Sequence, residues 1–248
     1  CRSVQNSPAK PMKIFTAQQM RELDRLTVDR CGIPYATLME TAGSRVVEAI
    51  IEHYGSVEEK HCAIYCGKGN NGGDGAVIAR LLWMRGASKV HVYLFGRLTD
   101  LKSEARANFE IIRQMSAAES PRKLGGELLF REISEESDEI EYDPLLFDFL
   151  IDALLGTGLT RPADGLYAAA IEKINELGEW EGTKVIAVDI PSGLASDSEQ
   201  PSGPHVKANL TVSFTGPKIG NVLSPACYAN GKLVVAAIGT PEWLFDEV

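Results

Sequence analysis

The sequence predicts an α/β protein, a Rossmann-like three-layer α/β/α sandwich with a mainly parallel sheet and two leading helices. One observation favours this class, and a second shows that the chain is long enough to form it. Short, continuously apolar runs alternate with helix-like stretches from residue 61 onward, which is typical of parallel strands covered on both faces. The chain of 248 residues is also long enough to bury a large core, and its 44% hydrophobic and 24% charged residues are ordinary for a globular protein.

Two helices are expected before the first strand. Residues 16–30 carry apolar side chains at helical spacing, with Thr16 as the N-cap. Residues 37–55 form the second helix, which Gly55 ends. Together they place two helices ahead of the first strand.

Strands and helices then alternate along the chain. The expected strands are 61–66, 89–96, 147–156, 184–193, 209–216 and 232–239. The expected helices between the earlier strands are 75–85, 102–115 and 166–177. Right-handed crossovers between parallel strands then produce a doubly wound sheet. No linker or repeat divides the pattern, so we expect a flexible tail over 1–11 and a single domain over 12–248.

Charge and cysteine content exclude several classes of protein. The net charge of −9 argues against binding to nucleic acid or to an anionic membrane. Five cysteines, an odd number, favour a reducing compartment, and we expect a cytoplasmic protein. Cys62 and Cys66 would lie roughly 13 Å apart on one face of a strand, too far to share a zinc ion. The acidic run 132–143 is expected to be a solvated surface loop.

The turn after the first strand has the spacing Gly67-x-Gly69-x-x-Gly72. Gly72 and Gly73 would permit close approach of the backbone, and a helix beginning near Asp74 would direct free N–H groups at the same space. This arrangement suits a phosphate or pyrophosphate. The second strand has no acid at its tip to hold a ribose, which argues against a hydride-transfer cofactor.

Polar residues follow the other strands at the same edge of the sheet, where ligands of such folds bind. Asp152 and Asp189 stand inside apolar runs, where a carboxylate is costly unless it is partnered. Asn71, Asp152 and Ser192 would offer one charged and several neutral oxygens, which suits a hard monovalent cation such as potassium. Each could equally tie its own turn by an Asx-type bond. Nucleophile elbows and Walker-type closures are absent from the sequence.

Five segments together resemble the YjeF N-terminal domain family. They are "GIPYATLMETAG" (32–43), "CGKGNNGGDG" (66–75), "DALLGTGLTRP" (152–162), "VDIPSGL" (188–194) and "GPKIG" (216–220). The likeness runs from about Phe15 to about Pro241. It implies an NAD(P)H-hydrate epimerase, an isomerase of metabolite repair that interconverts the R and S forms of NADHX and NADPHX.

The resemblance also implies roles for single residues. Asn71, Asp152 and Ser192 would bind potassium as the cofactor, and Asp189 would contact the substrate. The full set of substrate contacts would be Asn70, Asn71, Gly72, Gly73, Asp74, Gly156, Thr157, Gly158, Leu159, Thr160, Arg161, Pro162 and Asp189. Relatives suggest a homodimer and a functional partnership with an S-specific, ADP- or ATP-dependent dehydratase. The chain stops soon after the match, so we expect no dehydratase activity from it.

Inversion of the carbinol carbon requires loss of its hydroxyl, a planar iminium and addition of water to the other face. We expect Asp189 to act as both acid and base, with Lys218 as the reserve candidate. The competing hypothesis is a non-catalytic nucleotide- or partner-binding module of the same fold, and a weaker one is a hydrolase or transferase acting on another nucleotide-like ligand.

Overall fold

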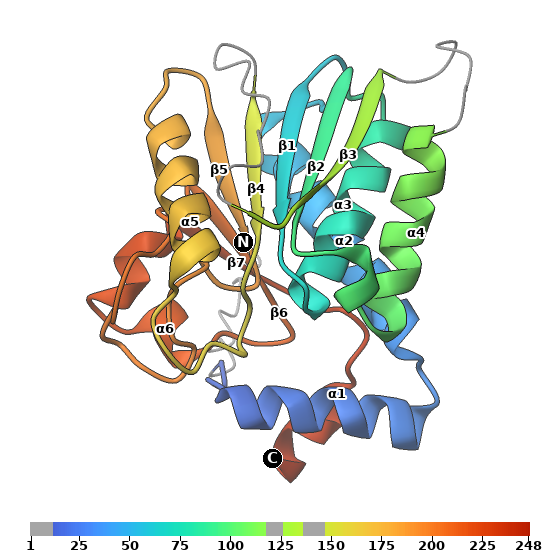
Figure 1. The fold of residues 1–248 in the computed structure, drawn as a ribbon. Coiled ribbons are helices and arrows are strands. Elements are labelled where there is room, and N and C mark those ends of the chain that lie inside the picture. The colour runs from blue at the N-terminus through green and yellow to red at the C-terminus, as the bar shows by residue number, and fades with distance from the viewer. Residues whose placement is uncertain (1–11, 118–125, 136–146) are drawn as a thin grey trace, which may run out of the picture.

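The structure is a computed structural model that describes residues 12–117, 126–135 and 147–248 (Figure 1). Its centre is one seven-stranded sheet in the order β3-β2-β1-β4-β5-β6-β7, and every neighbouring pair is parallel. The strands are β1 (His61–Cys66), β2 (Lys89–Phe95), β3 (Glu127–Ile133), β4 (Phe149–Ala153), β5 (Lys184–Val188), β6 (Leu210–Phe214) and β7 (Lys232–Ala236). The predicted α/β class with a parallel sheet is confirmed.

Helices cover both faces of this sheet. They are α1 (Ala17–Cys31), α2 (Tyr35–Tyr54), α3 (Asn70–Met84), α4 (Ser103–Ala117), α5 (Gly165–Gly178) and α6 (Ile219–Val222), with 3₁₀ turns η1 (Leu98–Asp100), η2 (Ala226–Asn230) and η3 (Glu242–Glu247). α2, α3 and α4 bury one core with one face of the strands, whereas α5 buries a second core with the opposite face. The three-layer arrangement follows from these two cores.

The first helix forms as the sequence predicts, but it does not cover a face of the sheet. Thr16 caps α1 by accepting a bond from the Gln19 N–H at 3.2 Å, while the Gln19 side chain accepts from the Thr16 N–H at 2.9 Å. The apolar stripe of α1 packs against Leu244 of η3. As a result, α1 lies across the carboxyl edge of the sheet (Figure 1).

Two element predictions need correction. No strand is predicted over 127–133, although Glu127–Ile133 pairs with the whole of β2 as β3. The third helix is predicted to begin at residue 75, whereas α3 begins at Asn70, so "NNGGD" is helical. The acidic run 132–143 is not wholly a loop, because Glu132 and Ile133 pair with β2 as the end of β3. Residues 136–143 of the run lie outside the described residues, as does the tail 1–11.

The cysteines behave as small apolar side chains. Cys62 and Cys66 are fully buried in the same core cluster.

Within the described ranges, no helix is both long and apolar enough to cross a lipid bilayer.

Candidate active site

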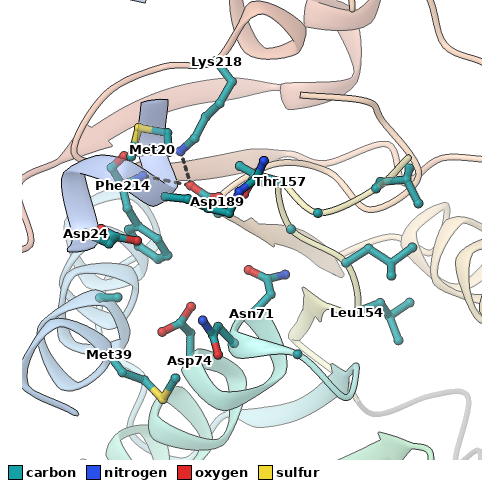
Figure 2. A pocket seen from close by; sticks show the side chains of 18 of the residues that line it. Met20, Asp24, Met39, Asn71, Asp74, Leu154, Thr157, Asp189, Phe214 and Lys218 are labelled. Atoms are coloured by element: carbon teal, nitrogen blue, oxygen red, sulfur yellow. Dashed lines mark hydrogen bonds and ion pairs between the residues drawn. The ribbon is translucent and has the colours of Figure 1, made fainter. Parts of the chain in front are cut away.

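A cavity of about 550 Å³ opens at the carboxyl edge of the sheet (Figure 2). Its walls come from α1, α2 and α3 and from the turns after β4, β5 and β6. Topology explains this location, because parallel strands bring the turns that follow them to one edge. The cavity is therefore where the sequence motifs meet.

The glycine-rich turn contributes Asn70, Asn71 and Asp74 to the cavity lining. They occupy the first turns of α3, where backbone N–H groups have no partner within the helix. Gly72 and Gly73 do not line the cavity. A Cβ on Gly72 would lie 1.8 Å from the Gly67 carbonyl oxygen, and one on Gly73 would lie 2.7 Å from the Met39 methyl carbon. These two glycines are needed for packing within the protein, and their contact with a substrate stays a prediction.

The turn after β4 forms the opposite wall. Six of its seven predicted residues line the cavity: Gly156, Thr157, Gly158, Leu159, Thr160 and Arg161. Pro162 does not line it and lies beside Gly203, where a Cβ would be 3.0 Å from the proline ring. Ser196 donates to the Thr157 carbonyl oxygen at 3.3 Å and ties this turn to the segment after β5.

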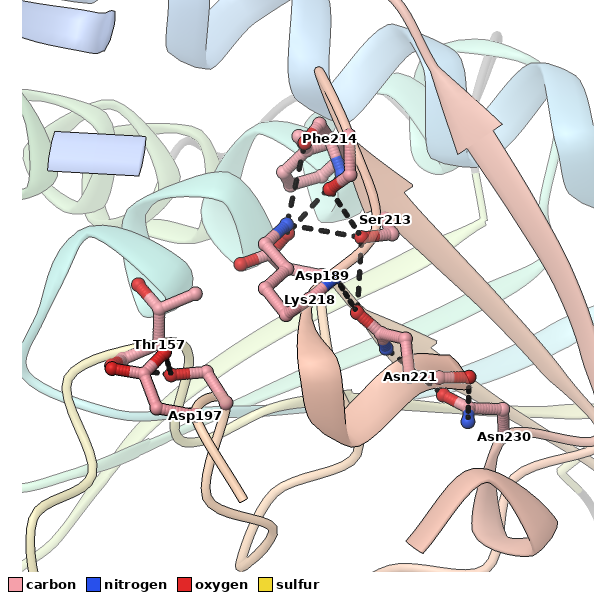
Figure 3. Close-up of polar contacts among 10 residues, drawn as sticks. Thr157, Asp189, Asp197, Ser213, Phe214, Lys218, Asn221 and Asn230 are labelled. Carbon is pink, nitrogen blue, oxygen red and sulfur yellow. Dashed lines mark hydrogen bonds and ion pairs between the residues drawn. The ribbon is translucent and has the colours of Figure 1, made fainter. Parts of the chain in front are cut away.

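Asp189 follows β5 directly and reaches the cavity with its carboxylate. Its backbone lies in the left-handed region, with φ of 69°, a conformation that costs free energy for a residue with a side chain. The Phe214 N–H donates to Asp189 Oδ1 at 3.1 Å, and the Lys218 ammonium donates to the same oxygen (Figure 3). Within the described part of the chain Oδ2 accepts no bond, which leaves it available to a ligand.

Lys218 is fully buried, an unusual position for an ammonium group. Besides Asp189 it donates to Ser213 Oγ at 3.0 Å and to the Phe214 carbonyl oxygen at 3.3 Å. Asn221 holds the backbone of Lys218 by accepting its N–H at 3.0 Å (Figure 3). Lys218 therefore fixes Asp189 from beneath the cavity.

Besides the half-buried Glu104, two further carboxyl groups line the same space, Asp74 on α3 and Asp24 on α1 (Figure 2). Burial raises the pKa of Asp74 well above its usual range, and the charges of Asp189 and Asp24 add to the effect. Burial, followed by the charge of Asp189, raises the pKa of Asp24 to about 6, while Lys218 opposes the increase.

Sequence reasoning missed Asp24 and other lining residues. The remainder are Met20, Arg21, Tyr35, Leu38, Met39, Ala42, Lys68, Gly69, Glu104, Leu154, Leu155, Tyr167, Phe214 and Ile238. One signal could have identified Asp24. It lies four residues after the apolar Met20 and so shares the buried face of the first helix.

The proposed cation ligands Asp152 and Ser192 are in direct contact behind the cavity wall. Asp152 is completely buried and accepts bonds from the Ser192 hydroxyl at 2.5 Å and the Ser192 N–H at 2.8 Å. It also accepts the Leu154 N–H at 3.3 Å, the Asx-type bond of the alternative interpretation. Burial raises the pKa of Asp152 to about 6 despite these bonds.

The third member, Asn71, packs against the adjoining turn. A Cβ on Gly156 would lie 3.3 Å from the Asn71 Cβ, and Leu155 of that turn donates its N–H to the Ser192 hydroxyl at 2.8 Å. The Asn71 Nδ2 atom is buried without a hydrogen-bond partner among the described residues. A buried carboxylate without a basic partner in the described ranges, beside neutral oxygens, fits a monovalent cation.

Comparison with known protein families gives one match that covers most of the chain. Residues 35–220 match the family described as YjeF-related protein N-terminus. The chain is also 42% identical over 234 residues to the bifunctional NAD(P)H-hydrate repair enzyme Nnr of Moorella thermoacetica. That alignment covers 94% of this chain and 42% of the relative, so the chain spans less than half the length of this relative.

A shorter relative matches over nearly its full length. The NAD(P)H-hydrate epimerase of Limosilactobacillus fermentum is 34% identical over 224 residues, which cover 90% of this chain and 95% of the relative. Among solved structures, that of the yeast protein ynu0 superposes with a TM-score of 0.70 over 91% of this chain and 88% of its own, at 22% identity. At that identity the superposition supports the fold alone.

Proposed function

Because the chain belongs to the family of YjeF-related protein N-termini, we propose that it is an NAD(P)H-hydrate epimerase acting on NADHX and NADPHX. One observation carries the proposal. The cavity joins the start of α3, the turn after β4 and the Asp189 carboxylate, and a buried lysine orients that carboxylate. A buried ammonium that fixes one oxygen of Asp189 and leaves the other toward the cavity favours an enzyme over a binding module.

The substrate's pyrophosphate is expected at the positive parts of the cavity. Unpartnered N–H groups at the start of α3 attract phosphate oxygens. Arg21, Lys68 and Arg161 also line the cavity, and their charges offset those of the phosphates. This placement favours contacts from the lining residues of the two turns, whereas contacts of Gly72, Gly73 and Pro162 rest on the family resemblance alone.

We place the hydrated nicotinamide ring, where the reaction occurs, at the end of the cavity beside Asp189. In an epimerisation the hydroxyl leaves the hydrated nicotinamide ring as water, the ring nitrogen forms a planar iminium, and water adds to the other face. Asp189 Oδ2 can give a proton to, or take one from, the oxygen on that carbon, while Lys218 and the Phe214 N–H orient the carboxylate through Oδ1.

Potassium is proposed as the cofactor, held by Asn71, Asp152 and Ser192. When bound, it would neutralise the buried Asp152 and stabilise the turns around the phosphates. We further propose cooperation with an S-specific, ADP- or ATP-dependent dehydratase, since relatives carry the name of a bifunctional repair enzyme. The homodimer stays a proposal that rests on the family resemblance alone.

The test uses a mixture of R- and S-NADPHX with excess S-specific dehydratase. The dehydratase removes the S form quickly and leaves the R form to convert at its spontaneous rate. Addition of this protein in potassium buffer is expected to accelerate recovery of NADPH absorbance, and addition in sodium buffer is expected to do so much less. A rate equal to the spontaneous one, with correctly folded protein, would contradict the proposal and favour a binding module.

A further inference from the structure

An epimerase that removes and restores water must handle protons on both faces of a planar ring. The proton for the leaving hydroxyl is needed on one face, and the proton of the incoming water must be accepted on the other. One carboxyl group lies on one side of a bound ring and cannot reach both faces without a large movement. The cavity therefore needs a second acid–base group, if the proposed function is correct.

Asp24 meets this requirement from a different wall. It projects from α1 into the cavity that Asp189 enters from the end of β5 (Figure 2). Its Oδ1 atom is buried and makes no hydrogen bond to any described residue. A buried oxygen without a partner is costly, so a structural role for this carboxyl is poorly supported.

The position of α1 is fixed by contacts with the catalytic turns. Asp197, in the segment after β5, accepts the Ala17 N–H at the start of α1 at 2.6 Å. The Phe15 N–H, just before the helix, donates at 3.0 Å to the carbonyl oxygen of Pro217, which precedes Lys218. Asp24 is thus held in a defined relation to Asp189 and Lys218.

The charged and titratable groups around Asp24 come from every neighbouring element. They are Arg21 on α1, Tyr35 on α2, Asp74 on α3, Glu104 on α4, Asp189 after β5 and Lys218 before α6. Asp74 is the rival for the second role. Burial raises the pKa of Asp74 well above the usual range, whereas Asp24 carries a buried Oδ1 atom without a partner among the described residues, and its pKa of about 6 suits both gain and loss of a proton.

We infer that Asp24 is a second catalytic residue, which serves the face of the ring opposite Asp189. In one direction, protonated Asp24 gives its proton to the hydroxyl, the C–O bond breaks, and the nitrogen lone pair forms the iminium as water leaves. A water molecule then adds to the other face, the C=N π electrons return to nitrogen, and the released proton passes to Asp189 Oδ2. In the reverse direction Asp189 gives the proton and Asp24 accepts it. After each turnover, proton exchange with solvent restores the starting protonation states of the two carboxyl groups.

Oxygen exchange separates this mechanism from one with a single carboxyl. Purified R-NADPHX and S-NADPHX are incubated separately in H₂¹⁸O with each variant, and mass spectrometry follows ¹⁸O entry alongside inversion. Asp24→Asn is expected to lower inversion by about 100-fold or more. It should still exchange the oxygen of one epimer, the one whose hydroxyl faces Asp189. Asp189→Asn should exchange only the other epimer.

The matched control is Asp29→Asn, on the same helix but with an exposed carboxylate paired with Arg25. It should leave both inversion and exchange unchanged. Inversion by Asp24→Asn within about threefold of the unaltered protein would overturn the inference, as would loss of exchange from both epimers in a folded variant. An unaltered protein that fails to epimerise would instead remove the proposed function on which the inference rests.

Discussion

The buried ammonium of Lys218 donates to the carboxylate of Asp189, which reaches the cavity. The side chain of Asp189 is 13% exposed and that of Lys218 is 1% exposed. A pair this deeply placed loses much hydration, and only good geometry and additional hydrogen bonds compensate for that loss. Ser213 and Phe214 supply those bonds to the ammonium.

Lys218→Met should therefore damage both stability and activity. The change leaves Asp189 with the Phe214 N–H alone, and loss of one partner of a buried pair typically costs about 3–5 kcal/mol. Chemical denaturation measures the free energy of unfolding, and the coupled NADPHX assay measures activity in whatever fraction stays folded.

The matched control for this change is Lys60→Met at the opposite edge of the sheet. Lys60 and Asp148 form an ion pair at 2.8 Å, but their side chains are 40% and 34% exposed. Such pairs contribute about 1 kcal/mol or less. Equal destabilisation by the two changes would contradict the importance given to burial of Lys218.

Potassium should raise the melting temperature of the unaltered protein more than sodium does at equal ionic strength. A cation that binds only the folded state stabilises it, and Asp152 is a buried carboxylate without a basic partner in the described part of the chain. Asp152→Asn should abolish the difference between the two salts. Differential scanning fluorimetry needs no substrate, so it tests the cation site independently of activity.

Sequence reasoning located most of the fold because burial on both faces leaves a strong apolar pattern in central strands. β3 was not predicted because it lies at the edge of the sheet, where the side chains of Glu127–Ile133 are mostly only half-buried and include three charges. The first turn of α3 was not predicted for another reason. Asn and Gly have poor helix propensity, and tertiary packing at Gly72 and Gly73 determines the helix there.

Some residues of the candidate site could be predicted from the sequence, and others could not. Residues after parallel strands could be grouped because topology brings them to one edge, as with Asp189 and Gly156. Asp24 lies on α1, and the order of the strands does not determine where that helix packs. Its place in the cavity depends on how α1 packs across the edge against η3.

A substitution in the glycine-rich motif can test whether Gly72 is needed for packing within the protein, independently of any ligand. Gly72→Ala would place a methyl group 1.8 Å from the Gly67 carbonyl oxygen, a backbone atom that cannot move aside easily. We expect destabilisation of about 3 kcal/mol, measured by denaturant unfolding without substrate. Gly158→Ala is the control, because a Cβ there meets no atom within 4 Å and its φ is not positive. Comparable stability of the two variants would show that Gly72 is not required for packing.

Asp24→Asn should make the folded protein more stable at neutral pH, although it removes a proposed catalytic group. The pKa of Asp24 is raised from 3.8 to about 6 in the folded state, so its ionised form is less favourable there than in the unfolded chain. The carboxyl therefore lowers stability above pH 6, by up to about 3 kcal/mol at 1.36 kcal/mol per pKa unit. Below pH 3.8 both states are protonated and this cost vanishes.

The stabilisation by Asp24→Asn should accordingly grow between about pH 4 and pH 6 and then remain level. Unfolding free energies of the two proteins across this range measure the difference directly. Asp29→Asn provides the reference, since its exposed carboxylate pairs with Arg25 and should give no gain with rising pH. A variant that is less stable than the unaltered protein at pH 7 would mean that the Asp24 carboxylate stabilises the fold, and the assignment of Asp24 to catalysis would lose its physical basis.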